Sequence, residues 1–524
     1  MSEREYIVTL KKGVDYEAFN QEMIEETGAG NIPNRSATIA NARPGSQRNT
    51  HYALTDEEAT DLRQDDRVVD VAIPPEQDEN LEIGLTATYQ GNFYKGTSEL
   101  STKNIDWGKR RHSVVTEDTT WSTNLDSSYN YALDGTGVDV VIQDSGLQVD
   151  HPEFNDAAGV SRVQLIDWYA ASGLSGSQSA NHNRDRDGHG THVGGTAVGL
   201  TFGWARNARI YGLKVNGLEG SGDSGTGISI NDVFDVIKLW HRNKPIDPIT
   251  GRKRPTIINA SWGYSTPASS LDSVSYRGVT YTSGNDASFS SSPNTRMRDT
   301  YGIYPYFTTS GYRAPVRVAS VDTDVQELID EGVHVCIAAG NNSFKVDVSG
   351  GDDYNNSFDR GTGDKFYHRG SSPFSTEAFM IGSLLSENAA GDKKVNFSTT
   401  GPGVDIYAAG DEILSCTSNT NKFTDAAYWG NSSFRQTNIN GTSMASPQVC
   451  GVGALYLQSN PGISPAELRT MIHNDSSTTM PAGTLTGYGS TDNAMGGPQR
   501  VLVHRYNTAI PYVNNITGKY NIRN

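Results

Sequence analysis

The segment Gly441–Pro447, of sequence Gly-Thr-Ser-Met-Ala-Ser-Pro, most constrains what this chain can fold into. A glycine-bearing turn precedes Ser443 and the apolar run Val449–Leu455 follows it, which predicts a turn that leads into a buried helix. A serine at such a place is usually a helix cap whose oxygen accepts a backbone N–H. The small residues around it also allow the turn to expose the hydroxyl and to leave backbone N–H groups facing a developing oxyanion. Alone, Ser443 is therefore only a candidate nucleophile.

Two further segments supply the groups that a serine nucleophile needs. The apolar, β-branched run Val138–Gln143 predicts a buried parallel strand that ends at Asp144, where open α/β sheets place their sites. His189 stands between two glycines, before small and apolar residues that suit a helix packed closely on the sheet. Taken singly, either residue is more often structural. Together with Ser443 they predict an orienting acid, a base and a nucleophile of one mechanism.

These segments resemble those of the subtilases, the subtilisin-type serine proteases. The resemblance rests on Asp144-Ser145-Gly146, His189-Gly190-Thr191-His192 and Gly441–Pro447, which occur in the family's chain order. It covers roughly residues 105 to 475, with proteinase K-like features after His189. It implies a three-layer α/β fold, in which helices flank a mostly parallel sheet. It also implies a serine endopeptidase that hydrolyses peptide bonds through an acyl-enzyme intermediate.

The resemblance extends to residues around the three segments. Asn341 follows the predicted strand Val333–Ile337 and matches the side-chain donor that forms an oxyanion hole with the Ser443 backbone N–H. His192 is interpreted as a core histidine. The positions that match the two substrate-binding edges are Gly220, Ser221, Gly222, Ser261, Trp262 and Gly263. Trp262 either shapes an apolar subsite, which would favour large apolar side chains, or faces the core.

No cofactor is needed for this chemistry, but the resemblance implies a structural Ca²⁺ site that includes Asp405. A second candidate for cation binding is the Gly- and Asp-rich stretch 344–369, with Asp347, Asp352, Asp353, Asp359 and Asp364. A solvated acidic loop is the favoured interpretation of that stretch, because its spacing matches no EF-hand.

The first 80 residues are predicted to form a separate small domain. Strands at Tyr6–Leu10 and Val68–Ile73 enclose a helix at Tyr16–Glu26 and a second helix whose start, Thr55–Glu58, has a capping-box pattern. This order resembles the inhibitor-like, split-βαβ (ferredoxin-like) propeptide of the family, which implies a zymogen inhibited by its own propeptide. An unrelated small α/β domain is the alternative.

Residues 81–104 are predicted to be a linker with an autoprocessing site, which the resemblance implies near Asn80 or Leu81, although any bond in 78–104 is allowed. Lys109–Arg111 is either a basic cleavage signal or, preferably, a solvated surface turn. The catalytic domain is assigned to 105–480, with insertions near 265–313 and 344–369. A C-terminal extension, 481–524, follows.

Charge and composition exclude some partners. The net charge is −17, and the first 80 residues hold 17 acidic against 8 basic side chains. Nonspecific nucleic-acid binding requires basic surface and is not expected. The three cysteines, Cys336, Cys416 and Cys450, lie far apart and predict no disulfide framework.

The start of the chain lacks the pattern of a Sec signal peptide, and no stretch has the length of a membrane span. These observations favour a cytoplasmic protein, an unusual export route or a virus particle, unless an upstream start is missing. The expected partners are protein or peptide substrates and the chain's own propeptide, with no nucleic acid and no membrane. The alternative function is a structural or binding protein of the subtilase fold, such as a virion component that retains its propeptide.

Overall fold

The computed structural model describes most of the chain, in several ranges. They are residues 3–25, 32–77, 82–85, 89–90, 107–113, 133–248, 251–267, 273–282, 284–286, 300–303, 313–359, 364–386, 392–480 and 494–504. Among these residues, no helix combines the length and the apolar character that crossing a membrane requires.

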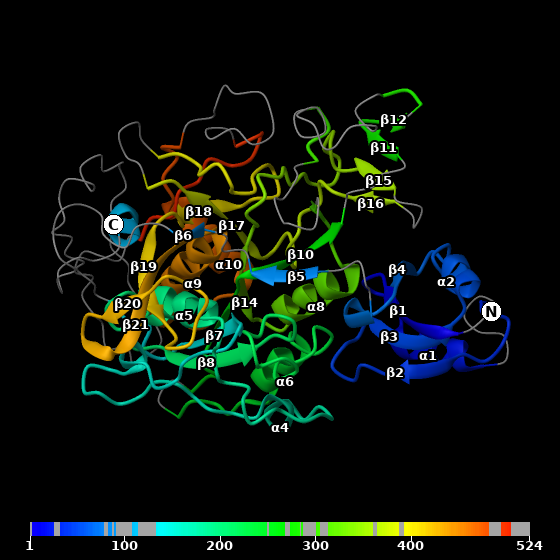
Figure 1. Ribbon diagram of the computed structural model, residues 1–524. Coiled ribbons are helices and arrows are strands. Elements are labelled where there is room, and N and C mark those ends of the chain that lie inside the picture. The colour runs from blue at the N-terminus through cyan, green and yellow to red at the C-terminus, as the bar shows by residue number, and fades with distance from the viewer. Residues whose placement is uncertain are drawn as a thin grey trace.

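The centre of the protein is a six-stranded parallel sheet with the order β18-β17-β14-β9-β7-β8 (Figure 1). Its strands are β7 (Asp139–Asp144), β8 (Arg209–Lys214), β9 (Thr256–Ala260), β14 (His334–Ala338), β17 (Phe379–Leu384) and β18 (Ile406–Ala409). Every residue in them except Arg209 is buried, as expected for a parallel sheet covered on both faces. The strand predicted to end at Asp144 is confirmed as β7.

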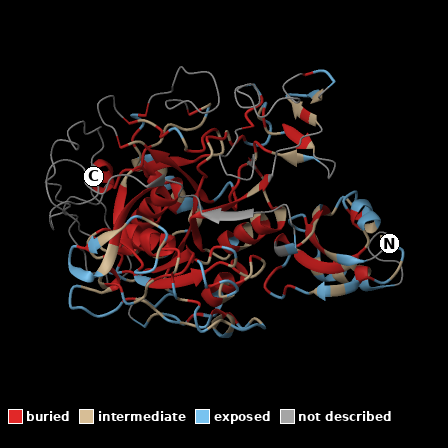
Figure 2. Cartoon of the chain, in the orientation of Figure 1, coloured by how far each residue is buried: buried red, intermediate tan, exposed pale blue. Residues whose placement is uncertain are grey.

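Two hydrophobic cores lie on opposite faces of this sheet, because successive strand side chains alternate between faces. Val140 and Ile142 belong to the first core and Val141 to the second. Helices α5 (His189–Val198), α9 (Thr442–Ser459) and α10 (Pro465–Asp475) contribute to the first core, and α4 (Trp168–Ser172), α6 (Asp235–Asn243) and α8 (Ala319–Asp330) to the second. Figure 2 shows the buried sheet and helices as one red interior. The expected three-layer α/β fold is confirmed.

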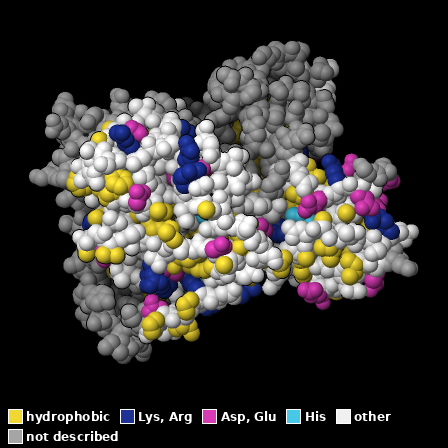
Figure 3. Space-filling view, turned by 60° about the horizontal axis from the view of Figure 1, so that its bottom comes forward, with side chains coloured by type: hydrophobic (Ala, Val, Ile, Leu, Met, Phe, Trp, Pro, Cys, Tyr) yellow, Lys and Arg dark blue, Asp and Glu magenta, His cyan; other side chains and the backbone are white. Residues whose placement is uncertain are grey.

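Residues 3–77 form a small sheet of order β2-β3-β1-β4 with a core of its own. Its elements are β1 (Arg4–Leu10), α1 (Tyr16–Ile24), β2 (Thr38–Asn41), β3 (Asn49–Leu54), α2 (Asp56–Leu62), β4 (Val68–Ala72) and a short 3₁₀ helix at Pro75–Gln77. The capping box at the start of α2 is confirmed, since Thr55 and Glu58 each bond the other's backbone N–H. Strands β2 and β3 were not predicted. In Figure 3 this N-terminal unit lies at the right, with magenta acidic side chains spread over it.

Part of the predicted linker is regular structure. Strand β5 (Glu82–Leu85) pairs antiparallel with β10 (Trp262–Pro267), and β6 (Tyr89–Gln90) pairs antiparallel with the end of β21 (Asn431–Asn440). In Figure 1 the blue arrow of β5 lies beside the green β10. The rest of the 81–104 stretch lies outside the described residues.

The two stretches predicted to be insertions share one sheet. Strands β11 (Ser273–Tyr276) and β12 (Val279–Thr282) of the first join β15 (Ser357–Asp359) and β16 (Lys365–Phe366) of the second in one sheet. The buried Asp353 bonds Arg277 at 2.7 Å and Lys345 at 2.8 Å. For Asp353, the prediction of a solvated acidic loop is therefore wrong. The carboxylate is buried between two cations.

Two further sheets contain the remaining strands. In one, β21 lies between β19 (Ile413–Thr417) and β20 (Ala426–Tyr428). In the other, β10 lies between β5 and β13 (Arg313–Pro315). A short 3₁₀ helix spans Pro152–Phe154. In the C-terminal extension, the backbones of Arg500 and Leu502 bond Tyr407 of β18, so this segment lies along the sheet edge.

The structure of the basic run at 109–111 fits neither a cleavage signal nor a solvated surface turn, the two interpretations of its sequence. It lies in helix α3 (Trp107–His112), where Lys109 and Arg111 are buried. Lys109 Nζ donates to the Thr201 carbonyl at 2.7 Å, and Arg111 Nε donates to Asp392 at 2.6 Å. These two side chains form neither an accessible cleavage signal nor a solvated turn, because tertiary partners draw them into the main domain.

Candidate active site

Asp144 and His189 meet at the carboxyl end of the central sheet. Asp144 is the last residue of β7, and its Oδ1 lies 2.8 Å from His189 Nδ1 at the first residue of α5. Both side chains are fully buried. His189 Nε2 and Asp144 Oδ2 are buried without a hydrogen-bond partner in the described part of the chain. One ring nitrogen is thus held by a carboxylate while the other remains available to accept a proton.

A second buried carboxylate fixes the loop before His189. Asp185 accepts hydrogen bonds from the Asp187, Gly188 and Thr191 backbone N–H groups and from the Thr191 hydroxyl. It also accepts one from Ser145 Oγ at 3.0 Å, and Ser145 Oγ accepts the Gly190 N–H. Asp185 was not singled out from the sequence. Its only local signal is its place four residues before His189.

The turn into α5 depends on a glycine. Gly188 has a φ of 92°, in the left-handed region, and a Cβ there would lie 2.4 Å from the Asn421 Cβ. Any other residue would be both strained and obstructed at this position. The glycine before His189 therefore allows this histidine to be the first residue of α5.

Ser443 lies at the start of α9, where a proline removes one of the helix's backbone hydrogen bonds. Pro447 has no N–H to offer the carbonyl four residues earlier, which is that of Ser443. Ser261 Oγ donates to this carbonyl instead, at 3.1 Å, and Ser443 Oγ lies 3.3 Å from the Ser261 carbonyl oxygen. These reciprocal contacts fix the Ser443 backbone against the end of β9.

Asn341 is oriented by the residue before Ser443. Its Oδ1 accepts the Thr442 backbone N–H and the Thr442 hydroxyl, both at 2.8 Å. Its Nδ2 is buried and has no partner among the described residues. An amide held by its oxygen presents its N–H groups on the other side, which suits donation to an oxyanion.

The predicted substrate-binding residues divide into two sets. Trp262 and Gly263 pair with Leu85 and Gly84 of β5, so this edge binds an extended strand. The Trp262 side chain is fully buried and its Nε1 donates to Gln143 at 3.0 Å, which decides for the core-facing alternative. Gly220 and Gly222 are not paired with β5 and pack against Arg186.

His192 has the environment of a core histidine. It is fully buried, and its Nε2 lies 3.0 Å from the Ile413 carbonyl. Burial lowers the pKa of His192 to about 3, so the ring is neutral at ordinary pH.

Asp405 differs from the expected calcium ligand. Arg469 lies 2.5 Å from Oδ1 and His473 lies 2.9 Å from Oδ2. A guanidinium and an imidazole thus occupy both oxygens that a calcium ion would need.

A different group, Asp235, Asp324 and Glu327, brings its carboxylate oxygens within 4.8 Å of one another. Such a group could hold a metal ion. In this structure, however, Arg43 contacts Asp235 and Asp324, and Lys238 contacts Asp235 and Glu327. Side-chain cations therefore fill the cluster.

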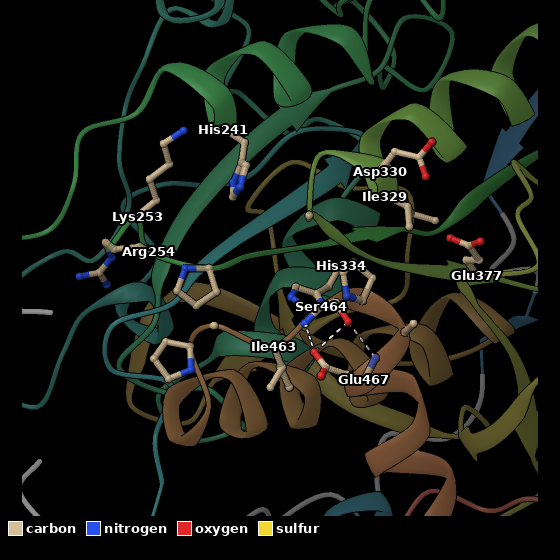
Figure 4. Close-up of a pocket in the computed structure, with 16 residues that line it drawn as sticks. His241, Lys253, Arg254, Ile329, Asp330, His334, Glu377, Ile463, Ser464 and Glu467 are labelled. Carbon is tan, nitrogen blue, oxygen red and sulfur yellow. Dashed lines mark hydrogen bonds between the residues drawn. The ribbon is translucent and has the colours of Figure 1, made fainter. Parts of the chain in front are cut away.

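A pocket of about 480 Å³ lies away from the site (Figure 4). His334, at the first residue of β14, and Pro255, just before β9, line it together with the start of α10. Asn341 and Ser261 follow the opposite ends of the same two strands. None of the predicted site residues borders this pocket, so it belongs to the other end of the sheet.

Comparison with known proteins shows the fold and the family of this chain. One similar solved structure is that of fervidolysin from Fervidobacterium pennivorans, a keratinolytic enzyme related to subtilisin. The match covers 98% of this chain and 62% of fervidolysin, with a TM-score of 0.52 and 15% identity. It shows a shared fold. The model of the subtilase family matches residues 135–499. The chain belongs to the subtilase family.

Curated relatives are similar at the level of sequence. The alkaline serine exoprotease A of Vibrio alginolyticus is 25% identical over 81% of this chain and 54% of its own length. Proteinase R of Parengyodontium album is 27% identical over 68% of this chain and 61% of its own length. The chain thus spans little more than half of the Vibrio relative.

Proposed function

We propose that this protein is a serine endopeptidase with Asp144, His189 and Ser443 as its catalytic residues. The observation that carries the proposal is the buried Asp144–His189 bond, which leaves His189 Nε2 without a partner in the described part of the chain. In the mechanism, His189 takes the proton of Ser443 as Oγ attacks a peptide carbonyl, and then gives it to the leaving amine. Asp144 holds the ring in one tautomer and stabilises its positive charge. Water then hydrolyses the acyl-enzyme by the same route.

The negative charge that develops on the substrate's carbonyl oxygen is stabilised by hydrogen-bond donors that are already in position. Asn341 Nδ2 fits this role because Thr442 holds the amide by its oxygen. The Ser443 backbone N–H, at the start of α9, is the second donor in the proposal. Both donors are fixed before substrate binds, so little reorganisation accompanies the reaction.

We further propose that residues 1 to about 85 act as a propeptide that inhibits the site. Two pairings support this. Leu85 opposes Trp262, next to Ser261, and Tyr89 opposes Asn440, three residues before Ser443. The chain therefore approaches the site along one edge and leaves it along another. The bond that the enzyme cuts in itself then lies between Leu85 and Tyr89, later than the resemblance alone implies.

A buried ion-pair cluster supports the inhibitory role of the N-terminal unit. Arg43 lies 3.0 Å from Asp235 of α6 and 2.9 Å from Asp324 of α8. Asn49 Nδ2 adds a 2.8 Å bond to Asp324. The Arg43 side chain is only 1% exposed. An arginine buried between two carboxylates of the main domain is suited to hold the N-terminal unit in place after cleavage.

The experiment combines intact mass with a fluorophosphonate serine probe on purified full-length chain. Wild type is expected to yield a fragment ending between Leu85 and Tyr89 and to react with the probe after that fragment is released. Ser443→Ala is expected to keep one full-length mass and to remain unlabelled. Ser459→Ala, at the far end of the same helix, is the matched control and is expected to behave as wild type. A labelled Ser443→Ala protein would contradict the assignment, whereas an unlabelled wild type with its propeptide removed would favour a binding role.

A further inference from the structure

Arg186 is a cation without a counter-ion in the described part of the chain, and it lies beside the proposed site. It stands three residues before His189. Its Nε is buried and has no hydrogen-bond partner, and no ion pair joins Arg186 to any other described residue. The residue as a whole is half-buried, so an anion that binds it would offset the cost of burying part of an unpaired charge.

The acidic residues on either side of Arg186 in sequence, and Asp223 next to Gly222, already have other partners. Asp185 accepts its bonds from Ser145, Thr191 and the backbone. Asp187 pairs with Lys422 at 2.8 Å. Asp223 lies 3.1 Å from both Lys214 Nζ and Arg184 Nε. None of these carboxylates forms an ion pair with Arg186 in the described part of the chain, so its guanidinium is open to a carboxylate of a ligand.

The Arg186 guanidinium lies against the loop Gly220–Gly222. The sequence predicts that this loop and the β10 edge bind the substrate from its two sides. A Cβ on Gly222 would meet Arg186 Nη1 at 3.4 Å and Cζ at 3.5 Å, and a Cβ on Gly220 would lie 2.2 Å from the Arg186 carbonyl carbon. The glycines therefore let the arginine pack closely on this loop. Because three residues span at most about 10 Å, Arg186 stays close to His189.

We propose that Arg186 is a specificity-determining residue that binds an acidic side chain of the substrate, within the few residues that precede the cleaved bond. This inference rests on the proposed peptidase function. A guanidinium binds a carboxylate through two parallel, charge-assisted hydrogen bonds, which are stronger in a partly desolvated groove. The stretch of this chain that leads to the groove is acidic by sequence, with Glu76, Asp78, Glu79 and Glu82.

The test uses pairs of fluorogenic peptides that differ only by Glu or Gln at one of the four positions before the cleaved bond. The readout is the Glu/Gln ratio of kcat/KM, which cancels general losses of activity. Wild type is expected to favour Glu by about tenfold or more at one position, the effect of one charge-assisted hydrogen bond. Arg186→Gln is expected to bring that ratio to about one, and Arg186→Glu to favour Lys over Glu at the same position.

Arg184→Gln is the matched control, since Arg184 is a neighbouring, 46% exposed arginine that already pairs with Asp223, and it should retain the wild-type ratio. Wild type that cleaves Glu and Gln peptides equally at all four positions would overturn this inference and leave the proposed function standing. If Arg186→Gln fails to fold, the wild-type ratio and its decrease at high salt decide the question alone. Absence of both cleavage and probe labelling in processed wild type would overturn the proposed function and this inference with it.

Discussion

Ser145 Oγ donates a 3.0 Å hydrogen bond to Asp185, which joins the end of β7 to the loop that leads into α5. Asp144 is the residue before Ser145, and His189 follows four residues after Asp185. The bond therefore ties the two loops whose relative position sets the Asp144–His189 distance. The Asp185 carboxylate thus supports the loops that carry Asp144 and His189.

Asp185→Asn is expected to reduce reaction at Ser443. An amide has one acceptor oxygen, and its NH₂ would face donors that now bond the second carboxylate oxygen. We expect a 10- to 100-fold slower fluorophosphonate labelling, from about 1–3 kcal/mol per unsatisfied buried donor. Asp167→Asn is the control, because Asp167 caps α4 and asparagine caps helices equally well. An unchanged labelling rate in Asp185→Asn would show that the loop positions itself without this carboxylate.

Asn341→Ala is expected to lower kcat by about 10²–10³ with little change in KM, because the donor acts on charge that develops in the transition state. Subtilisin itself shows a loss of this size when its own side-chain donor to the oxyanion is removed. Peptide hydrolysis under saturating substrate measures the effect. Asn342→Ala, at the next residue, is expected to retain nearly full kcat. A rise in KM alone would assign Asn341 to ground-state binding instead.

Arg43→Gln is expected to destabilise the uncleaved chain by about 3–5 kcal/mol, because it leaves buried carboxylates of α6 and α8 without their cation. The measurement is the free energy of unfolding in the Ser443→Ala background, where no processing occurs. Lys12→Gln is the control, because Lys12 also pairs with a residue of α8, Asp330, but is 71% exposed. We expect this variant to lose no more than about 1 kcal/mol of unfolding free energy. Equal losses for the two variants would argue against a buried anchor.

Acidification is expected to destabilise the fold through its buried histidines. Burial lowers the pKa of His112, His192 and His504 to about 3, below the ordinary value of 6.5. Between these values the unfolded chain binds more protons than the folded one, so stability falls as pH falls from about 6.5 towards 3. Thermal unfolding from pH 7.5 to 4.5 should show a decreasing midpoint, with a shallower decrease for His192→Gln. A midpoint that stays constant across this range would contradict the burial of these rings as neutral groups.

Local patterns predicted much of this architecture. The strand ending at Asp144, the turn into the Ser443 helix and the capping box at Thr55 follow from residues close together in sequence, so they could be read directly. The strand at Asn49–Leu54 was missed. It pairs with β1, about 45 residues away, and such pairing leaves little local signal.

The sequence by itself determined which groups could act and in what order they occur, because Asp144, His189, Asn341 and Ser443 each stand in a recognisable local segment. Only the tertiary structure decided what surrounds them. It turned Trp262 into the core, drew Lys109 and Arg111 into buried contacts, and laid β5 and β6 on the two edges beside Ser443. These outcomes depend on partners 92 or more residues away in sequence, and side-chain burial and pairing across such separations are set by packing rather than by local pattern.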